Sequence, residues 1–532
     1  MKSIIAFSIL LFSSYLQAQT TPKLVVGIVV DQMRYDFLYR YYEKYGSNGF
    51  KKLMNKGVNC SNTYYNYFPT YTGPGHASIY TGTTPGVHGI VANDWYETAI
   101  NRGMYVTEDT NVVGVGTTTK EGKMSPANLL TTTITDQLKL SNQQQSKVIG
   151  ISLKDRGAIL PAGHLANAAY WYDGETGKWI TSSYYMNKLP NWVEDFNAKN
   201  YSQQYINKGW NTLYPINTYT ESTSDNQGYE KAFDKTGTPT FPYELTKYTT
   251  GKKPFDIVRR TPFGNTLTKD LAKEAIKNEQ LGKGKFTDFL AISFSSTDYV
   301  GHQFGPHSIE TEDTYLRLDA DIADFITYLE KQMPSKDFLI FLTADHGVVE
   351  NPEHLQQLKI PAGYFDFEGA IKRVEHTLDS MYGNKEWILE EMNQQIYLNP
   401  IAQTKEIQEV IAKSLLKEKG AAAVYGDLLG NGHHITDNEY IKNGHWYKRC
   451  GNMYVQFEPG WFEKYDKMCT THGSYYEYDT HVPLLWYGNG LKPSRIYDKV
   501  YITDITPTIA QFMNLLAPNG CTGKPIVPIL KR

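Results

Sequence analysis

Six side chains of types that ligate metal ions occur at four places in the chain. Three are carboxylates and three are imidazoles, and each lies just after or beside a short apolar segment. They are Asp31, Asp298, His302, Asp345, His346 and His472. Oxygen and imidazole ligands in this mixture suit zinc better than calcium, which prefers oxygen alone, or an iron–sulfur cluster, which needs thiolates. No Cys-x-x-Cys pair occurs, so a thiolate zinc site has little support. The residue types therefore predict a zinc-type metal centre.

Each of these residues, taken alone, has an ordinary structural explanation. A single Asp at a strand end commonly caps a helix or forms a turn, and a single loop His is commonly just hydrogen-bonded. Two arrangements are more specific: Asp345-His346-Gly directly after one apolar segment, and Asp298 four residues before His302 after another. Their combination favours a metal centre over the structural explanation.

A turn rich in proline and glycine contains the candidate nucleophile, Thr72. Residues 68–82 read Phe-Pro-Thr-Tyr-Thr-Gly-Pro-Gly-His-Ala-Ser-Ile-Tyr-Thr-Gly, and a helix can start at Pro74. Thr72 would then lie near a helix N-terminus, whose free N–H groups attract an anion. On local sequence alone, Thr72 is better explained as a helix N-cap. The metal centre is what favours its assignment as the nucleophile.

The candidate residues are far apart in the sequence, so a scaffold must bring them together. Five short apolar segments rich in β-branched residues are predicted to be its strands. They cover residues 23–31, 147–153, 286–294, 337–343 and 482–487. Helical patterns lie between them, which predicts an α/β fold with a mostly parallel sheet covered by helices on both faces. Ligands of such sheets bind beyond the carboxyl ends of the strands, where the candidate residues occur.

Two segments interrupt this pattern and are predicted to be insertions in a single catalytic domain of residues 19–532. The first, about 157–252, is rich in Tyr, Trp, Asn and Ser and has weak periodicity. The second, about 352–458, is interpreted as a small α+β cap. It contains helical patterns at 367–382 and 404–417 and a short strand at 395–398.

The N-terminus has the layout of a secretory signal peptide, predicted for residues 1–18. Met1-Lys2 is followed by an apolar run from Ile4 to Leu16 and then by Gln17-Ala18-Gln19, which predicts a periplasmic or secreted protein. The run is too short for an ordinary membrane span, and no other apolar stretch reaches the roughly 20 residues that a span needs. We expect no stable membrane anchor after cleavage; a retained N-terminal anchor is the alternative.

The net charge argues against one class of function, and the cysteine content bears on disulfide bonds. The net charge of the 532-residue chain is −3 and no basic stripe occurs, so the electrostatic footprint of a nucleic-acid binder is missing. Disulfides are expected in an exported chain, and Cys450 with Cys469 is the easiest pair because it closes a short loop. The spacing of the four cysteines leaves the pairing open. They are Cys60, Cys450, Cys469 and Cys521.

The order of the motifs resembles the alkaline phosphatase superfamily, over nearly the whole mature chain. The motifs are Asp31, Pro-Thr-x-Thr72, His88-Gly-Ile-Val-Ala-Asn93-Asp, Asp298-x-x-x-His302, Asp345-His346-Gly and His472-Gly. Within the superfamily the chain is most similar to the branch of nucleotide pyrophosphatases and phosphodiesterases. Lys154-Asp-Arg156-Gly, absent from the diesterases of that branch, makes it similar to phosphate-irrepressible, periplasmic alkaline phosphatases with a threonine nucleophile.

The resemblance implies an alkaline-phosphatase-like three-layer sandwich with two zinc ions per chain and a covalent phosphothreonine at Thr72. One zinc would be held by Asp298, His302 and His472. The other would be held by Asp31, Asp345, His346 and the Thr72 oxygen. Two zinc ions bring four positive charges against three carboxylates, so the site favours an anionic substrate.

Asn93, Lys154 and Arg156 are the candidates for binding the oxygens of the substrate. A phosphate monoester presents three non-bridging oxygens that these groups can bind, whereas a diester places a second organic group there. We therefore expect a monomeric phosphatase that hydrolyses small-molecule phosphate monoesters. An ordinary charged turn is the alternative explanation for Lys154 and Arg156.

Three other functions compete with this expectation. A phosphodiesterase or nucleotide pyrophosphatase would use the same metals and Thr72. A sulfatase is weaker, because the chain has no Cys-x-Pro-x-Arg segment. A surface binding protein with a structural zinc would have a closed, tetrahedral metal site without an open position.

Overall fold

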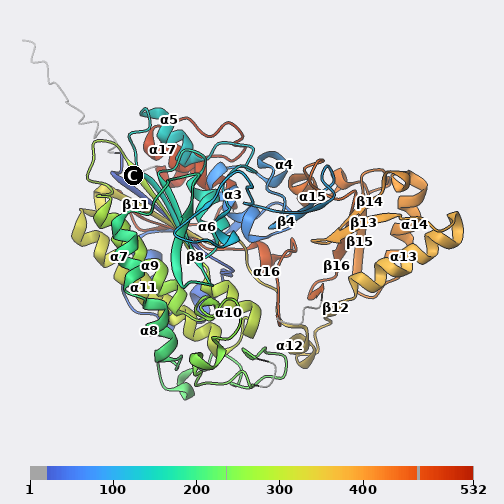
Figure 1. Ribbon diagram of the computed structural model, residues 1–532, viewed down its shortest axis with the longest axis horizontal. Helices are drawn as coiled ribbons and strands as arrows, with labels where there is room; N and C mark the ends of the chain where they lie inside the picture. Colours follow the sequence, from blue (N-terminus) through green and yellow to red (C-terminus); the bar gives the residue numbers. More distant parts are fainter. Residues whose placement is uncertain (1–20, 235–236, 464–467, 531–532) are drawn as a thin grey trace, which may run out of the picture.

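A computed structural model describes residues 21–234, 237–463 and 468–530, so the signal peptide predicted for residues 1–18 lies outside the described residues. The core is a ten-stranded sheet with helices around it (Figure 1), which confirms the α/β prediction. Five neighbouring strands at its centre are parallel. In spatial order they are β11 (Phe338–Thr343), β1 (Leu24–Val30), β10 (Asp288–Phe294), β7 (Val148–Ser152) and β8 (Ala168–Asp173).

Both ends of the sheet are mixed, with antiparallel pairs beside β11 and beside β8. Beyond β11 lie β18 (Leu484–Gly488), β2 (Val58–Cys60) and β19 (Ser494–Ile496). Beyond β8 lie β9 (Lys178–Ser182) and β6 (Gly114–Val115). The five predicted strands correspond to β1, β7, β10, β11 and β18, and the parallel order holds only for the central part of the sheet.

The central strands are apolar because helices cover both faces. Every residue of β1, β10 and β11 is buried. In Figure 1 the sheet separates two groups of helices. One group contains α3 (Thr72–Thr81), α5 (Ile134–Ser141), α6 (Asp155–Ala162) and α17 (Ile505–Met513). The other contains α7 (Asn191–Ala198), α9 (Phe263–Asn278), α10 (Ser296–Phe304) and α11 (Ile309–Gln332).

The register of the central strands fixes where their following residues meet. Val30 of β1 is opposite Phe294 of β10, and Val29 is opposite Thr343 of β11. The three neighbouring strands are parallel and therefore end at the same edge of the sheet. The segments that contain the candidate ligands leave the sheet at that edge.

A separate lobe follows β11 and has its own hydrophobic cluster. Its four-stranded antiparallel sheet has the order β13 (Ile388–Met392), β14 (Gln395–Leu398), β16 (Met453–Phe457), β15 (Ala421–Gly426). The predicted helices and strand of this region are present as α13 (Phe367–Tyr382), α14 (Lys405–Leu415) and β14. Within the Tyr-rich segment at about 157–252, β8 and β9 pair into the central sheet. The boundaries proposed for the two insertions stay a prediction.

The expected disulfide between Cys450 and Cys469 is wrong, because all four cysteines are free. The Cys450 sulfur accepts a hydrogen bond from the backbone N–H of Trp446. The backbone N–H of Cys469 instead donates to the carbonyl of His302 at 2.8 Å, so the two thiols have different surroundings. Among the described residues, none of the helices combines the length and apolar character that a membrane span requires.

Candidate active site

The six candidate metal ligands meet at the carboxyl edge of the sheet. Asp31 follows β1, Asp345 and His346 follow β11, and α10 places Asp298 and His302 beside them. His472 reaches the same place from the loop before α16 (Glu477–Thr480). Two groups result, Asp298 with His302 and His472, and Asp31 with Asp345 and His346. Within each group the ligand atoms lie within 4.8 Å of one another.

The three imidazoles are oriented alike. Each Nδ1 is hydrogen-bonded to a backbone carbonyl, at 2.9 Å for His302, 2.9 Å for His346 and 2.8 Å for His472. A carbonyl can only accept, so Nδ1 has the proton and Nε2 keeps its lone pair. Nε2 of His302 lies 3.1 Å from Asp298 Oδ1, and Nε2 of His346 lies 3.5 Å from both Asp31 and Asp345. The free nitrogens therefore face the carboxylates.

The protonation states of two of the three imidazoles suit metal binding directly, whereas burial would lower the pKa of the third, His302, but Asp298 raises it above the ordinary value. Burial lowers the pKa of His472 to about 3 and that of His346 well below its ordinary value, so both rings are neutral at pH 7. Burial and neighbouring Asp298 raise the pKa of Asp31 to about 6, and burial and Asp31 raise the pKa of Asp345 well above its ordinary value. Buried carboxylates of this kind are costly unless cations lie beside them.

Three carboxylate oxygens of the second group, that of Asp31, Asp345 and His346, lack hydrogen-bond partners among the described residues. Both carboxylate oxygens of Asp31 and Oδ2 of Asp345 are buried without a hydrogen-bond partner among the described residues. Asp31 Oδ2 has an ion-pair contact instead, 2.7 Å from Lys154 Nζ. A divalent cation in each group would satisfy these oxygens, and imidazole with carboxylate is a zinc-type donor set. The residues present therefore fit a metal centre.

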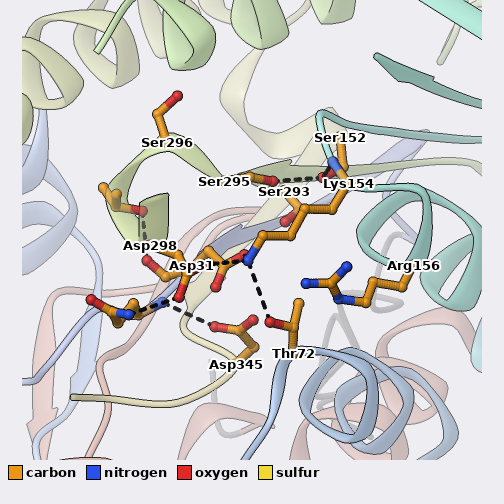
Figure 2. Close-up of polar contacts among 12 residues, drawn as sticks. Asp31, Thr72, Ser152, Lys154, Arg156, Ser293, Ser295, Ser296, Asp298 and Asp345 are labelled. Atoms are coloured by element: carbon orange, nitrogen blue, oxygen red, sulfur yellow. Dashed lines mark hydrogen bonds and ion pairs between the residues drawn. The ribbon is translucent and has the colours of Figure 1, made fainter. Parts of the chain in front are cut away.

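Figure 2 shows Thr72 beside Asp345 and Arg156, with the Lys154 amine between Thr72 and Asp31. Its Oγ1 is 3.5 Å from His346 Nε2 and 3.4 Å from Lys154 Nζ, and the residue is buried. Thr72 is the first residue of α3, and Tyr71 occupies the capping position without a capping side-chain bond. The helix-cap explanation therefore does not account for the Thr72 hydroxyl, which faces the metal-type groups.

Lys154 links the two metal-type groups. Its Nζ lies 2.7 Å from Asp31 Oδ2 and 2.6 Å from Asp298 Oδ2, and its side chain is 2% exposed. Burial would lower the pKa of Lys154, but Asp298 and Asp31 raise it above the ordinary value, so the amine is charged. Such burial is incompatible with a solvated turn residue.

Arg156 and Asn93 approach Thr72 from the other side. Figure 2 shows the guanidinium of Arg156, in the first turn of α6, beside Thr72. Its Nε is buried without a partner among the described residues, which leaves a donor for an anion. Asn93 Oδ1 accepts a hydrogen bond of 2.8 Å from the backbone N–H of Gly73, which fixes its amide next to Thr72.

Gln32, which the sequence analysis did not single out, contacts both metal-type groups. Its backbone N–H donates to Asp345 Oδ1 at 3.1 Å, and its Nε2 donates to Asp298 Oδ1 at 2.7 Å. It adopts a left-handed backbone with φ of 64°, which is rare for a residue other than glycine. Its position directly after Asp31 at a strand end was the available clue.

Tyr105 is a second residue that the sequence did not reveal. It ends β5 (Arg102–Tyr105), which pairs with β4 (Asp94–Glu97), so one hairpin positions both Asn93 and Tyr105. The Tyr105 hydroxyl accepts a hydrogen bond from Arg156 Nη1 at 2.9 Å and donates to Asp155 Oδ1 at 2.7 Å. The phenol therefore fixes the direction of the guanidinium.

Tyr105→Phe is expected to lower kcat/KM for an aryl phosphate monoester by about tenfold, because Arg156 Nη1 loses its partner and the guanidinium its fixed position. Steady-state kinetics measures this, with Tyr447→Phe, at an exposed tyrosine, as the matched control. In an Arg156→Ala background the same change should have little further effect. Unchanged kcat/KM in Tyr105→Phe would show that the phenol does not position Arg156.

The chain is similar to known proteins over nearly its whole length. The model of a family described as type I phosphodiesterase / nucleotide pyrophosphatase matches residues 25–481. A Myroides odoratus protein named calcium-transporting ATPase is 48% identical over 516 residues, 95% of this chain and 94% of that protein. Alkaline phosphatase PafA of Elizabethkingia meningoseptica is 44% identical over 539 residues, 98% of each chain.

The fold is similar as well. The crystal structure of wild-type alkaline phosphatase PafA superposes with a TM-score of 0.92 at 43% identity, and the match covers 96% of this chain and 99% of that chain. Thr72 and the six residues of the two metal-type groups all lie inside the region 25–481 that the family model matches.

Proposed function

The chain belongs to the type I phosphodiesterase / nucleotide pyrophosphatase family, and we propose that within it the protein is an alkaline phosphatase that hydrolyses phosphate monoesters to phosphate and alcohol. The observation on which this rests is the pair of cations beside Thr72, Lys154, which is buried, and Arg156, which is partly buried. The similarity to alkaline phosphatase PafA supports the same assignment.

The cations favour a monoester over a diester. A monoester dianion presents three charged or partly charged non-bridging oxygens, which an amide, an ammonium and a bidentate guanidinium can bind together. A diester places a second organic group against one of these donors and leaves it unpaired in a buried site. The alternative, a phosphodiesterase that uses the same metals and Thr72, is therefore disfavoured by Lys154 and Arg156.

Two zinc ions per chain are the proposed cofactors. Asp298, His302 and His472 would hold one, and Asp31, Asp345 and His346 with the Thr72 oxygen would hold the other. Bound metal would lower the pKa of the Thr72 hydroxyl and stabilise the leaving alkoxide. Gln32 would orient a carboxylate of each group through its two hydrogen bonds.

Thr72 carries out the bond changes in this proposal. Its Oγ attacks phosphorus while the bond to the leaving alcohol breaks, which forms a phosphothreonine. Water then attacks the same phosphorus, the bond to Thr72 Oγ breaks, and phosphate is released. Gly73 N–H donates to Asn93 Oδ1 and Pro74 has no N–H, so the start of α3 offers the phosphoryl group little beyond the backbone N–H of Thr72.

The three donors have separate tasks in both steps. Lys154 pairs with the carboxylates of Asp31 and Asp298, and its Nζ also lies 3.4 Å from Thr72 Oγ1, where it can donate to a phosphoryl oxygen. Arg156 is held through Nη1 by Tyr105 and presents its remaining donors to the non-bridging oxygens. Asn93 completes the set from the side of Gly73. Together they stabilise the charge that spreads over the phosphoryl oxygens.

The Myroides relative is named an ATPase, and hydrolysis of ATP is compatible with the proposed chemistry. The terminal phosphoryl group of ATP presents three non-bridging oxygens, as a monoester does. The proposed site would therefore also hydrolyse ATP, and ATPase activity is an expected side reaction of the same residues.

Removal of metal is expected to abolish turnover of an aryl phosphate monoester, and added Zn²⁺ to restore it, because the proposed activation of Thr72 depends on metal. The measurement is activity against metal content after chelation and desalting, with parallel additions of Mg²⁺ and Ca²⁺. Full activity in protein shown to be metal-free would end the two-metal proposal.

The cellular location and the oligomeric state are proposed from the sequence alone. Export to the periplasm or medium rests on residues 1–18, which lie outside the described residues. We also propose a monomer without a stable membrane anchor and without a nucleic-acid partner, in keeping with the net charge of −3.

A further inference from the structure

A third group of metal-type side chains lies outside the candidate active site. His307, Glu350 and His354 each offer one ligand atom, and these three atoms lie within 4.8 Å of one another. All three residues are partly exposed. This group meets the same distance condition as the two groups beside Thr72, yet it has no part in the proposed reaction.

Glu350 is held with one oxygen directed at the histidines. Arg34 donates to its Oε1, and Arg34 Nε is in turn paired with Asp36 at 2.8 Å. The second oxygen, Oε2, lies 2.8 Å from His307 Nδ1. Metal-binding carboxylates commonly have such an outer partner, which fixes the direction of the ligating oxygen.

His354 adds a nitrogen without a partner. Its Nδ1 is buried and has no hydrogen-bond partner among the described residues. Its ring centroid lies 5.0 Å from that of His307. Burial and the neighbouring His307 lower the pKa of His354, so the ring is neutral at pH 7. A neutral, unpartnered imidazole nitrogen next to an oriented carboxylate is the arrangement that a metal ion would satisfy.

The third group is built on the segments that also form the active site. His307 follows α10, which contains His302, and Glu350 lies in the loop that contains His346. His354 lies in α12 (Pro352–Gln357), which begins two residues after Glu350. A metal ion here would connect the end of α10 to the start of the separate lobe.

We propose that His307, Glu350 and His354 form a third divalent-metal site, which binds zinc. Two imidazoles and one carboxylate match zinc, with a fourth position left for water. Arg34 shares the single carboxylate, so this site is weaker than the catalytic groups, which contain three carboxylates between them. Zinc should therefore fill the catalytic groups first and the third site at higher free concentration.

The test is the zinc content of the full chain at equilibrium with buffered free zinc. Metal-free parent protein, His354→Gln and the matched control His376→Gln are dialysed against rising free zinc, and bound zinc is counted by mass spectrometry. His376 is an exposed histidine of α13 outside the three groups. At saturation, His354→Gln is expected to bind about one zinc fewer than the parent, the control to match the parent, and all three to show equal monoester kcat/KM.

Two results would overturn the proposal. Equal zinc content in His354→Gln and the parent would leave the group as an ion-pair network of Glu350 with Arg34 and His307. Loss of zinc together with loss of activity would assign His354 to the catalytic centre instead. His307→Gln serves as the second variant if His354→Gln does not fold. Because the readout is a metal count, failure of the alkaline phosphatase proposal would not affect it.

Discussion

Thr72→Ala is expected to lower kcat for an aryl phosphate monoester by about 10³-fold or more, because it removes the hydroxyl that we propose accepts the phosphoryl group. Thr72→Ser should stay within about tenfold of the parent, since serine keeps a hydroxyl at the same position between His346 and Lys154. Single-turnover kinetics on the purified variants measures both values.

The helical position of Thr72 makes this comparison informative. Alanine is a good helix former and Thr72 makes no capping bond in α3, so the variant should fold. Thr81→Ala, at the other end of α3, removes a buried hydroxyl that donates to Ala77 O at 2.8 Å and should keep its activity. An alanine variant of Thr72 with turnover near that of the parent would show that Thr72 is not the nucleophile.

Lys154→Ala/Arg156→Ala is expected to lower kcat/KM for a monoester by about 10³-fold or more, and for the matching methyl diester much less. Removing one charge-assisted donor to a transition-state oxygen typically costs about 10²-fold or more. A diester has fewer charged oxygens to lose contact with. The measurement compares parent and variant on both substrates, read as free-energy differences.

The loss of Lys154 could act in two ways, through the substrate or through the metal ligands, and the experiment must separate the two. Lys154 pairs with Asp31 and Asp298, so its loss could also weaken metal binding. Arg156→Ala does not touch those carboxylates, and zinc should be counted in every variant. Equal losses on monoester and diester would mean that the two cations support the structure or the metal rather than select the substrate.

The strands that carry the site can be predicted from the sequence, because each is recognised from the residue types within its own short segment. β1, β10 and β11 are recognised as buried strands from their apolar, β-branched residues. Parallel strands of one sheet end at a common edge, so the polar residues that follow them must lie close together. Asp31, Asp298 and Asp345 follow from that rule before any contact is known.

The residue that orients Arg156 cannot be predicted in this way, because its position depends on the pairing of strands that are distant from Arg156 in the sequence. Tyr105 reaches Arg156 only because β4 and β5 pair with Asp94 opposite Tyr105, and nothing near Arg156 in the sequence indicates this. The same limit explains the wrong expectation for Cys450 and Cys469, which are close in sequence but have different neighbours in the fold. Proximity in sequence does not fix proximity in space.

The central claim is that this site selects phosphate monoesters, and the most direct test is kcat/KM of the zinc-loaded parent protein on an aryl phosphate and on its methyl diester. We expect the monoester to be preferred by about 10²-fold or more, because Asn93, Lys154 and Arg156 together bind the three oxygens that only the monoester presents. Equal values, or a preference for the diester, would contradict the claim and identify the protein as a phosphodiesterase.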